Sequence, residues 1–182
     1  DYLAVAFADE GVLLRERGIT MPVVVLNADA DSFDAMAANR LEPEIYSLRS
    51  LHEFAAAVER YGEQRYPIHV KLDTGMHRLG FVEEELPALL DALARYGRTV
   101  RVASVFAHLC TSDDPAQDDF TRLQIARFDR MSSRIAEALS YPVLRHTANS
   151  AAIERFPEAQ YDMCRLGLGL YGFGFEHNAA LC

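Results

Sequence analysis

The chain has 182 residues, half of them hydrophobic and a quarter charged, as is usual for a soluble globular protein with a substantial core. Its net charge of −9 argues against nucleic acid or an anionic membrane as the main partner, and no apolar run approaches the roughly 18 residues that span a bilayer. The three cysteines are too widely spaced for a disulfide framework or a zinc site. Cys110 and Cys164 lie in apolar runs, which suits buried thiols in a reducing cytoplasm.

Short β-type runs alternate with amphipathic runs along the whole chain. In chain order, the sequence predicts a strand at 2–7, a helix at 9–17, a strand at 22–27, a helix at 32–39, a strand at 44–48, a helix at 50–61, a strand at 68–73, a helix at 83–96, a strand at 100–109, a long helix within 118–139, a strand at 143–147, a short helix near 151–155 and a strand at 164–172. Several of these strands are apolar along their whole length, which indicates a parallel sheet covered by helices.

Two α/β architectures fit a chain of seven such units. A doubly wound sheet would carry a glycine-rich loop after its first strand, whereas this first strand runs into AFADEG. A (β/α)8 barrel of the TIM type has eight units and typically about 250 residues. We therefore predict that residues 1–182 form a partial barrel domain, with strands two to eight present and strand one missing at the N-terminal end.

Polar residues follow the ends of four successive predicted strands. They are Lys71 (the only lysine) and Arg78 within KLDTGMHRLG, His108, then His146, Asn149 and Ser150 within HTANSAA, and finally Arg165, Gly167 and Gly169. In barrels of this kind, reactive residues lie at the carboxyl ends of the strands and in the loops that follow. We therefore expect these residues to converge on one face.

Each group also has a purely structural interpretation. Asp73 and Thr74 could form a simple turn, and His108 could be a core histidine with its hydrogen bonds satisfied. Ser150 lacks the nucleophile-elbow pattern, which disfavours a catalytic triad and favours anion binding with nearby backbone N–H groups. Arg165 would be costly to bury in an apolar strand without a partner, so it is predicted to face a polar ligand.

Taken together, these motifs resemble those of the alanine racemases, pyridoxal-phosphate enzymes of the fold-type III group. The matching stretches are DYLAVAFADEGVLLRERGI, KLDTGMHRLGF, HTANSAA and DMCRLGLGLYG, which keep the family's order across nearly the whole chain. The DTGMxRLG and RxGxxLYG signatures are specific in combination. Position 77 is histidine where most racemases have glycine, which is similar to the racemase domains fused to a cell-wall ligase in some bacteria.

The resemblance implies a site for pyridoxal 5'-phosphate and a role for each matching residue. Arg165 is expected to hydrogen-bond the pyridine nitrogen, and His108 to lie against the ring. Arg78 is expected to assist the phenolic oxygen and the substrate carboxylate, and Lys71 corresponds to a lysine, often carbamylated in the family, that holds Arg78 in place. No metal is expected. The residues expected to line the phosphate site are Asn149, Ser150, Gly167 and Leu168.

The resemblance also implies that the full-length enzyme, a homodimer, converts L-alanine to D-alanine for peptidoglycan synthesis in the cytoplasm. Racemisation needs an acid/base group on each face of the substrate. In the family these are the cofactor-binding lysine on strand one, in a motif like VKANAYGHG, and a tyrosine from the partner subunit's C-terminal β-domain. Neither occurs in this sequence, so the chain is expected to hold no catalytic residue and to be inactive alone.

Two alternatives stay open at this point. The chain could belong to another fold-type III protein, either a racemase of a different amino acid, such as serine or a basic amino acid, or a non-catalytic pyridoxal-phosphate-binding barrel. It could also be a scaffold domain of a larger cell-wall enzyme. Substrate choice depends on the C-terminal part, so the sequence leaves alanine and other small amino acids as candidates.

Overall fold

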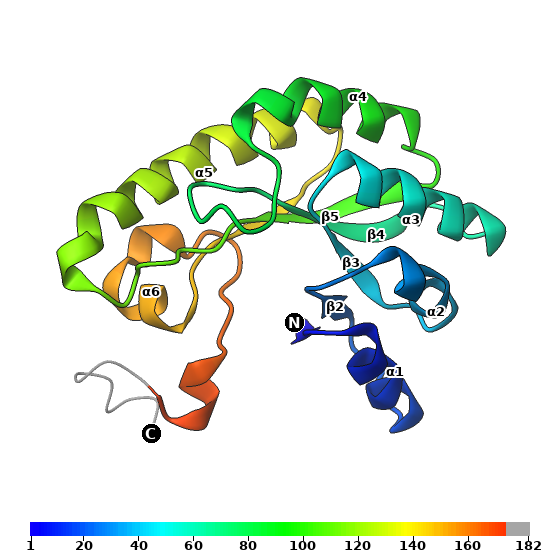
Figure 1. The fold of residues 1–182 in the computed structure, drawn as a ribbon, viewed down its shortest axis with the longest axis horizontal. Coiled ribbons are helices and arrows are strands. Elements are labelled where there is room, and N and C mark those ends of the chain that lie inside the picture. The colour runs from blue at the N-terminus through cyan, green and yellow to red at the C-terminus, as the bar shows by residue number, and fades with distance from the viewer. Residues whose placement is uncertain (174–182) are drawn as a thin grey trace. The chain divides into compact units, whose positions relative to one another are not determined.

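The computed structural model describes residues 1–173, which fall into two compact units (Figure 1). The first unit comprises Asp1–Lys71 and Glu84–Ala103, and the second comprises Leu72–Glu83 and the described residues from Ser104 onward. The six strands follow one another in the sheet in sequence order, from β1 to β6. The boundary falls inside β5, whose residues begin in the first unit and end in the second.

The first unit is a run of parallel strands, and a helix of the same unit follows each of the first four. Its strands are β1 (Leu3–Val5), β2 (Val23–Val25), β3 (Glu42–Ile45), β4 (Tyr66–Lys71) and the start of β5 (Val100–Phe106). Its helices are α1 (Ala8–Glu16), α2 (Phe33–Ala38), α3 (Leu48–Arg60) and α4 (Leu86–Arg95), with a 3-10 turn at Ala30–Ser32. The pairs β1–β2, β2–β3 and β3–β4 are all parallel.

Tyr66 shows which face of the first unit's sheet is packed against helices. Its ring meets Phe54 of α3 edge-on, with the ring centroids 5.3 Å apart, and its hydroxyl donates to the carbonyls of Met36 and Leu41. Figure 1 shows α2 and α3 on the same side of β3 and β4. Because side chains alternate along a strand, Ile68 and Val70 share the helix-covered face with Tyr66, and both are fully buried.

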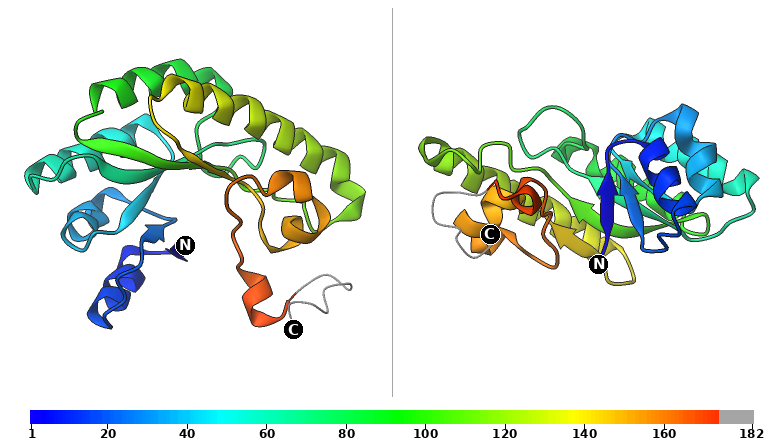
Figure 2. Two further views of the ribbon diagram at one scale, coloured as in Figure 1. Left: turned by 180° about the vertical axis from the view of Figure 1, so that it is seen from behind. Right: turned by 90° about the horizontal axis from the view of Figure 1, so that it is seen from below.

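The second unit is built around one long helix. It contains the end of β5 paired in parallel with β6 (Leu144–His146), the helices α5 (Asp118–Ala138) and α6 (Ser150–Arg155), and 3-10 turns at Pro115–Gln117, Pro157–Ala159 and Leu168–Tyr171. A turn at Glu83–Glu85 crosses the boundary between the units. Within this unit α5 lies beside α6, where Ile125 packs with Ala152 and Phe156 (Figure 2).

The structure confirms the predicted α/β class and the first six predicted strands, although most are shorter than predicted. Helix caps end two of them early. The Glu10 carboxylate accepts from the N–H groups of Ala6 and Phe7, so β1 stops at Val5. The hydroxyl of Ser47 accepts from the N–H of Ser50 and caps α3, so β3 ends at Ile45.

The strand predicted at 164–172 is wrong. This stretch is irregular up to Gly167 and then forms the 3-10 turn at Leu168–Tyr171. The Ser150 hydroxyl accepts from the N–H groups of Gly167 and Gly169, so these donors are used by a side chain and not by a neighbouring strand. The segment therefore forms no ladder with a neighbouring strand.

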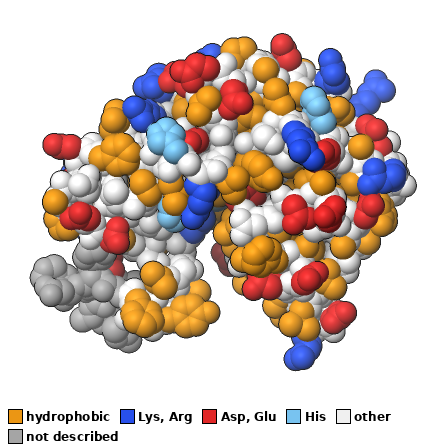
Figure 3. Space-filling model, viewed as in Figure 1, with side chains coloured by type: hydrophobic (Ala, Val, Ile, Leu, Met, Phe, Trp, Pro, Cys, Tyr) orange, Lys and Arg blue, Asp and Glu red, His pale blue; other side chains and the backbone are white. Residues whose placement is uncertain are grey.

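The end of the described chain exposes apolar side chains. Leu168, Leu170, Tyr171 and Phe173 are between 67% and 80% exposed, and Figure 3 shows hydrophobic side chains gathered there. Cys110 and Cys164 are only partly buried, less than the sequence predicted. Among residues 1–173, no helix is both long and apolar enough to cross a membrane.

Candidate functional site

Of the eight predicted site residues, all but Lys71 belong to the second unit. Lys71 is the last residue of β4, in the first unit, and is buried. Arg78 is an exposed residue of the loop that follows Leu72. Lys71 and Arg78 belong to different units, so their predicted proximity stays a prediction.

The Arg165 guanidinium is held by three carbonyl groups and one imidazole. Its Nη2 donates to the carbonyl oxygen of Ala107 at 2.7 Å and to that of Thr147 at 2.9 Å. Its Nη1 lies 2.9 Å from Nδ1 of His146 and 3.4 Å from that residue's carbonyl oxygen. The guanidinium carbon also lies 5.4 Å from the centre of the Phe106 ring. Polar groups at the ends of β5 and β6 thus fix the direction of this side chain, and the expectation that it faces a polar ligand stays a prediction.

His146 is neutral in this arrangement. A guanidinium has only N–H donors, so Nδ1 of His146 is the acceptor in the contact with Arg165 and carries no proton. The ring proton is then on Nε2, which donates to the Ser104 hydroxyl at 3.0 Å. The imidazole stacks on Phe106 with an interplanar angle of 4°. The sequence predicts that His146 lies at a strand end, but it indicates no role for Ser104, because one serine in an apolar strand carries no signal.

Two backbone N–H groups converge on the Ser150 hydroxyl. Its hydroxyl oxygen accepts from the N–H of Gly167 at 3.0 Å and from that of Gly169 at 3.1 Å. A Cβ built on Gly167 would meet nothing within 4 Å, so the space above this glycine is open. Leu168 follows in the 3-10 turn, and its side chain is exposed. The structure thus brings together three of the four residues predicted for the phosphate.

Asn149, the fourth residue predicted for the phosphate, links the Ser150 segment to the loop after β5. Its side-chain oxygen accepts from the N–H of Ala152, which caps α6, and from the Ser112 hydroxyl. Its amide nitrogen donates to the carbonyl oxygen of Leu109 at 3.0 Å. In this structure the amide of Asn149 holds the Ser150 loop in position.

Gln124 of α5 connects two loops of the site and was not foreseen from the sequence. It is fully buried, and its amide nitrogen donates to the carbonyl oxygen of His108 and to the hydroxyl of Thr74. Its amide oxygen accepts from the N–H of Cys110. Arg127, one helical turn further along α5, donates to the carbonyl oxygen of Thr74. The His108 backbone and the 72–80 loop are thus attached to the same helix.

The 72–80 loop is shaped by Asp73 and Gly80. The Asp73 carboxylate accepts from the N–H groups of Gly75 and His77. Burial alone would raise the pKa of this carboxyl, but these hydrogen bonds and the nearby His77 outweigh it, so the pKa is lowered. Gly80 has φ +127, and a Cβ there would lie 2.5 Å from the Asp73 nitrogen, so only glycine fits. The turn considered as an alternative does form, and Arg78 lies within it.

Lys71 has an acidic neighbour on the adjacent strand. Its ammonium nitrogen lies 3.8 Å from Oε1 of Glu44 on β3, and both side chains are nearly inaccessible to solvent. Two residues earlier on each strand, Glu42 and His69 form a second contact of 2.8 Å. The sequence indicates no role for either glutamate, because EPEI lacks the apolar pattern of a buried strand.

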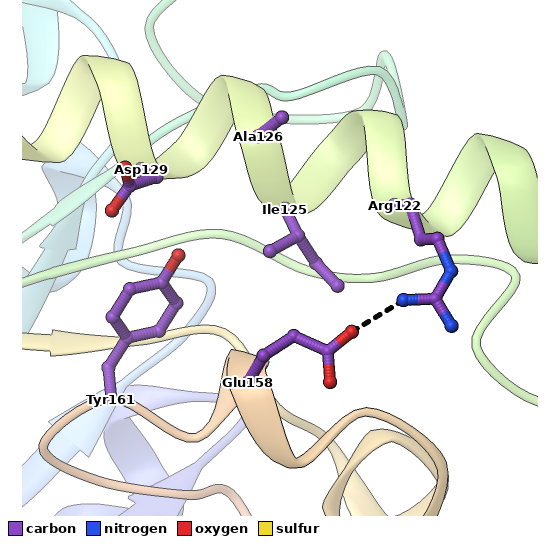
Figure 4. Close-up of a pocket in the computed structure, with 6 residues that line it drawn as sticks. All are labelled: Arg122, Ile125, Ala126, Asp129, Glu158 and Tyr161. Carbon is purple, nitrogen blue, oxygen red and sulfur yellow. Dashed lines mark hydrogen bonds and ion pairs between the residues drawn. The ribbon is translucent and has the colours of Figure 1, made fainter.

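A separate surface pocket lies between α5 and the Pro157–Ala159 turn (Figure 4). Arg122 and Glu158 form an ion pair of 2.6 Å at its edge, and Tyr161 lines the other side. It contains none of the predicted site residues. Among residues 1–173, no cluster of three or more histidine, cysteine, aspartate or glutamate side chains could hold a metal ion.

Comparison with known proteins identifies the family. The model of the alanine racemase N-terminal domain matches residues 1–174. The alanine racemase of Symbiobacterium thermophilum is 38% identical over 176 residues, which cover 94% of this chain and 45% of that protein. The alanine racemase of Nitratidesulfovibrio vulgaris is 39% identical over 176 residues, again 94% of this chain, and 46% of that protein.

Solved structures agree with this result. The alanine racemase of Clostridium difficile 630 superposes with a TM-score of 0.87 at 30% identity, over 98% of this chain and 46% of that one. This chain therefore has the fold of part of the TIM-type barrel, as predicted, and it spans about half the length of the curated relatives that it matches. By sequence and by structure, the chain belongs to the family of the alanine racemase N-terminal domain.

Proposed function

We propose that this chain is the cofactor-binding part of a pyridoxal-phosphate-dependent alanine racemase, which interconverts L- and D-alanine for peptidoglycan synthesis. The observation that carries the proposal is the guanidinium of Arg165, which the carbonyl groups of Ala107 and Thr147 hold in one direction. Family membership supports the racemase chemistry. The named relatives are alanine racemases, which supports alanine over other amino acids as the substrate.

The residues present fit the phosphate of the cofactor. Phosphate binds where backbone N–H groups and hydroxyls converge, and Gly167 and Gly169 direct their N–H groups at the Ser150 hydroxyl. The space above Gly167 is open, so a ligand can approach the backbone there. We assign the phosphate to Ser150, Gly167 and Leu168, with Asn149 holding the loop.

The residues also fit a pyridine ring. Arg165 stays cationic, so it offers N–H donors to a neutral ring nitrogen and disfavours a proton there, since two cations in contact would repel each other. The carbonyls of Ala107 and Thr147 keep the guanidinium from turning away. Because Nδ1 of His146 accepts a hydrogen bond from Arg165, this nitrogen has no proton to pass toward the pyridine ring. Arg165 thus acts as a hydrogen-bond donor of fixed direction and passes on no proton.

Three further residues complete the proposed site. We propose that His108, whose carbonyl oxygen accepts from Gln124, lies against the pyridine ring of the cofactor. Arg78 is assigned to the phenolic oxygen and the substrate carboxylate, with Lys71 as support. When bound, pyridoxal phosphate makes the α-hydrogen of an amino acid more acidic. The two groups that remove and return this hydrogen are proposed to lie outside this chain, one of them on the partner subunit of a cytoplasmic homodimer.

The proposal is tested with a full-length protein that contains this chain, assayed for conversion of L- to D-alanine with added pyridoxal phosphate. We expect turnover, and we expect Arg165→Gln to reduce it by about 10²-fold, as for loss of a preorganised electrostatic contact. The matched control is Arg122→Gln, which removes an exposed arginine paired with Glu158. The 182-residue chain alone should show no turnover.

The same assay separates the alternatives. Turnover of serine or a basic amino acid in preference to alanine would place the protein among other fold-type III racemases. Cofactor binding without exchange of the α-hydrogen of any amino acid would favour a non-catalytic barrel. Absence of both binding and turnover in the full-length protein would contradict the proposal.

A further inference from the structure

One face of α5 carries a stripe of polar residues, Thr121, Gln124 and Arg127, spaced three residues apart. Thr121 and Gln124 have no exposed surface. A polar side chain in such a place costs free energy unless its donors and acceptors find partners. The Thr121 hydroxyl has one 3.0 Å away, the hydroxyl of Thr111 in the loop after β5.

The partners of Gln124 come from two separate loops of the second unit. Its amide nitrogen donates to the Thr74 hydroxyl at 3.3 Å and to the carbonyl oxygen of His108 at 3.1 Å. Its amide oxygen accepts from the N–H of Cys110 at 3.1 Å. One buried amide therefore links the loop after β4 to the backbone of the segment after β5.

The same helix contacts the 72–80 loop at further points, and Figure 1 shows this loop alongside α5. Arg127 donates to the carbonyl oxygen of Thr74 at 3.1 Å. A Cβ built on Gly75 would lie 3.0 Å from Cζ of Phe120 and 3.2 Å from Nη1 of Arg127. The start of the loop is thus packed directly on α5.

We propose that Gln124 is a positioning residue that joins the loop of Arg78 to the backbone of His108, so that both meet the cofactor in one fixed arrangement. The inference rests on the proposed function, which assigns these two residues to the phenolic oxygen and the ring of one ligand. Gln124 is fully buried and acts only through its neighbours. A site that is already ordered binds more tightly, because no loop has to be ordered at the moment of binding.

A purely structural amide would behave differently. Its loss would lower the unfolding temperature but leave the folded enzyme with its normal cofactor affinity and turnover. A positioning amide also alters these two properties of the folded enzyme, because small displacements of groups that hold a ligand are costly for catalysis. The two roles are therefore separated by measurements on the folded protein.

The test uses a full-length protein that contains this chain, with Gln124→Leu as the main variant. The dissociation constant of pyridoxal phosphate is measured by visible circular dichroism, and kcat for alanine is measured at saturating cofactor. We expect about tenfold weaker cofactor binding, kcat lower by about tenfold or more, and a weaker dichroism signal from the bound cofactor.

Thr74 provides a second, milder test of the same link. Thr74→Val removes the hydroxyl that accepts from Gln124 and should weaken cofactor binding by about three- to fivefold. Thr74→Ser keeps a hydroxyl and should behave like the wild type. The double variant Gln124→Leu/Thr74→Val should bind no more weakly than Gln124→Leu, because the partner is already lost.

The matched control is Gln160→Leu, which removes a partly buried amide of the same unit that donates to the Ile153 carbonyl at 3.1 Å. It should leave cofactor affinity and kcat unchanged. Wild-type values in Gln124→Leu, an equal loss in Gln160→Leu, or additive losses in the double variant would overturn the inference. If Gln124→Leu does not fold, Thr74→Val and Thr74→Ser decide, and equal affinities in these two would contradict the link.

Failure of the proposed function gives a different result. A wild-type protein that binds pyridoxal phosphate without racemising alanine would contradict the racemase activity, and the cofactor affinities of the variants would still decide the role of Gln124. A wild type that binds no pyridoxal phosphate would overturn both.

Discussion

Arg165 and His146 lie 2.9 Å apart, guanidinium Nη1 to imidazole Nδ1, and this contact fixes the position of the imidazole proton on Nε2. The same imidazole reaches the Ser104 hydroxyl with its other nitrogen. A fully buried serine of β5, a histidine of β6 and the arginine of a later loop thus form one chain of hydrogen bonds. The partners that set the direction of Arg165 are therefore different from the four residues predicted to line the phosphate site.

His146→Phe should destabilise the protein by about 1–3 kcal/mol, because buried donors and acceptors lose their partner while the stacked ring remains. His146→Gln, which keeps a donor and an acceptor, should cost less. The measurement is urea unfolding followed by circular dichroism. The control His52→Gln changes an exposed histidine of α3 and should have little effect. An equally small effect of His146→Phe would contradict the hydrogen-bond chain.

Gln124→Leu should destabilise the protein by about 1–3 kcal/mol, because the N–H of Cys110 and the carbonyl of His108 would lose a buried partner. Hydrogen exchange should also quicken in the 72–80 loop, which Gln124 contacts through Thr74. The control is Gln117→Ala, at an exposed position just before α5. Unchanged exchange in the loop would show that Gln124 does not hold it.

Ser150→Ala should weaken binding of pyridoxine 5'-phosphate, a probe that lacks the aldehyde, by about five- to tenfold, the effect of losing one hydrogen bond. Binding of unphosphorylated pyridoxine should not change, because the hydroxyl is assigned to the phosphate. Isothermal titration calorimetry measures both. The control is Ser133→Ala on α5. An equal loss of affinity for both probes would contradict the assignment of the phosphate to Ser150.

Asp73 should make stability depend on acid pH. Its pKa is lowered in the folded protein, so the stability it contributes is fully present above its unfolded pKa, about 3.9. That contribution is lost as the pH falls through the lower, folded pKa. Asp73→Asn should therefore be less stable than the wild type at pH 7, and the difference should shrink toward pH 3. Urea midpoints across this range provide the test, with the exposed Asp113→Asn as control. A constant difference would rule out this linkage.

Gly80→Ala should destabilise the protein by about 1–3 kcal/mol, because the added Cβ would lie 2.5 Å from the Asp73 nitrogen at a φ of +127. Gly97→Ala is the matched control, since a Cβ at that position has its nearest neighbours at 3.4 Å and 3.5 Å. Thermal unfolding of the two variants compares them directly. Similar midpoints for both would show that the loop can shift to admit a side chain at residue 80.

The order and type of most elements can be predicted from the sequence alone. Strands such as VVV at 23–25 and helices such as α3, with Leu51, Phe54 and Val58 on one face, are set by local patterns of apolar residues. The motifs around Arg78, Ser150 and Arg165, together with the N-terminal stretch DYLAVAFADEGVLLRERGI, also sufficed to indicate the family, which the comparisons confirm. These signals are local because they depend on residues close together in the chain.

Tertiary structure decided which of these residues have partners and what the partners are. The sequence predicts a strand at 164–172, but the Ser150 hydroxyl, from a distant segment, accepts hydrogen bonds from two of its N–H groups. Gln124 is one polar residue on an amphipathic helix until folding buries it among the carbonyl and N–H groups of two loops. Glu44 pairs with Lys71 only because β3 and β4 align in one register. Hydrogen bonds and ion pairs between distant segments leave no periodic trace in the sequence, because nothing local specifies the partner.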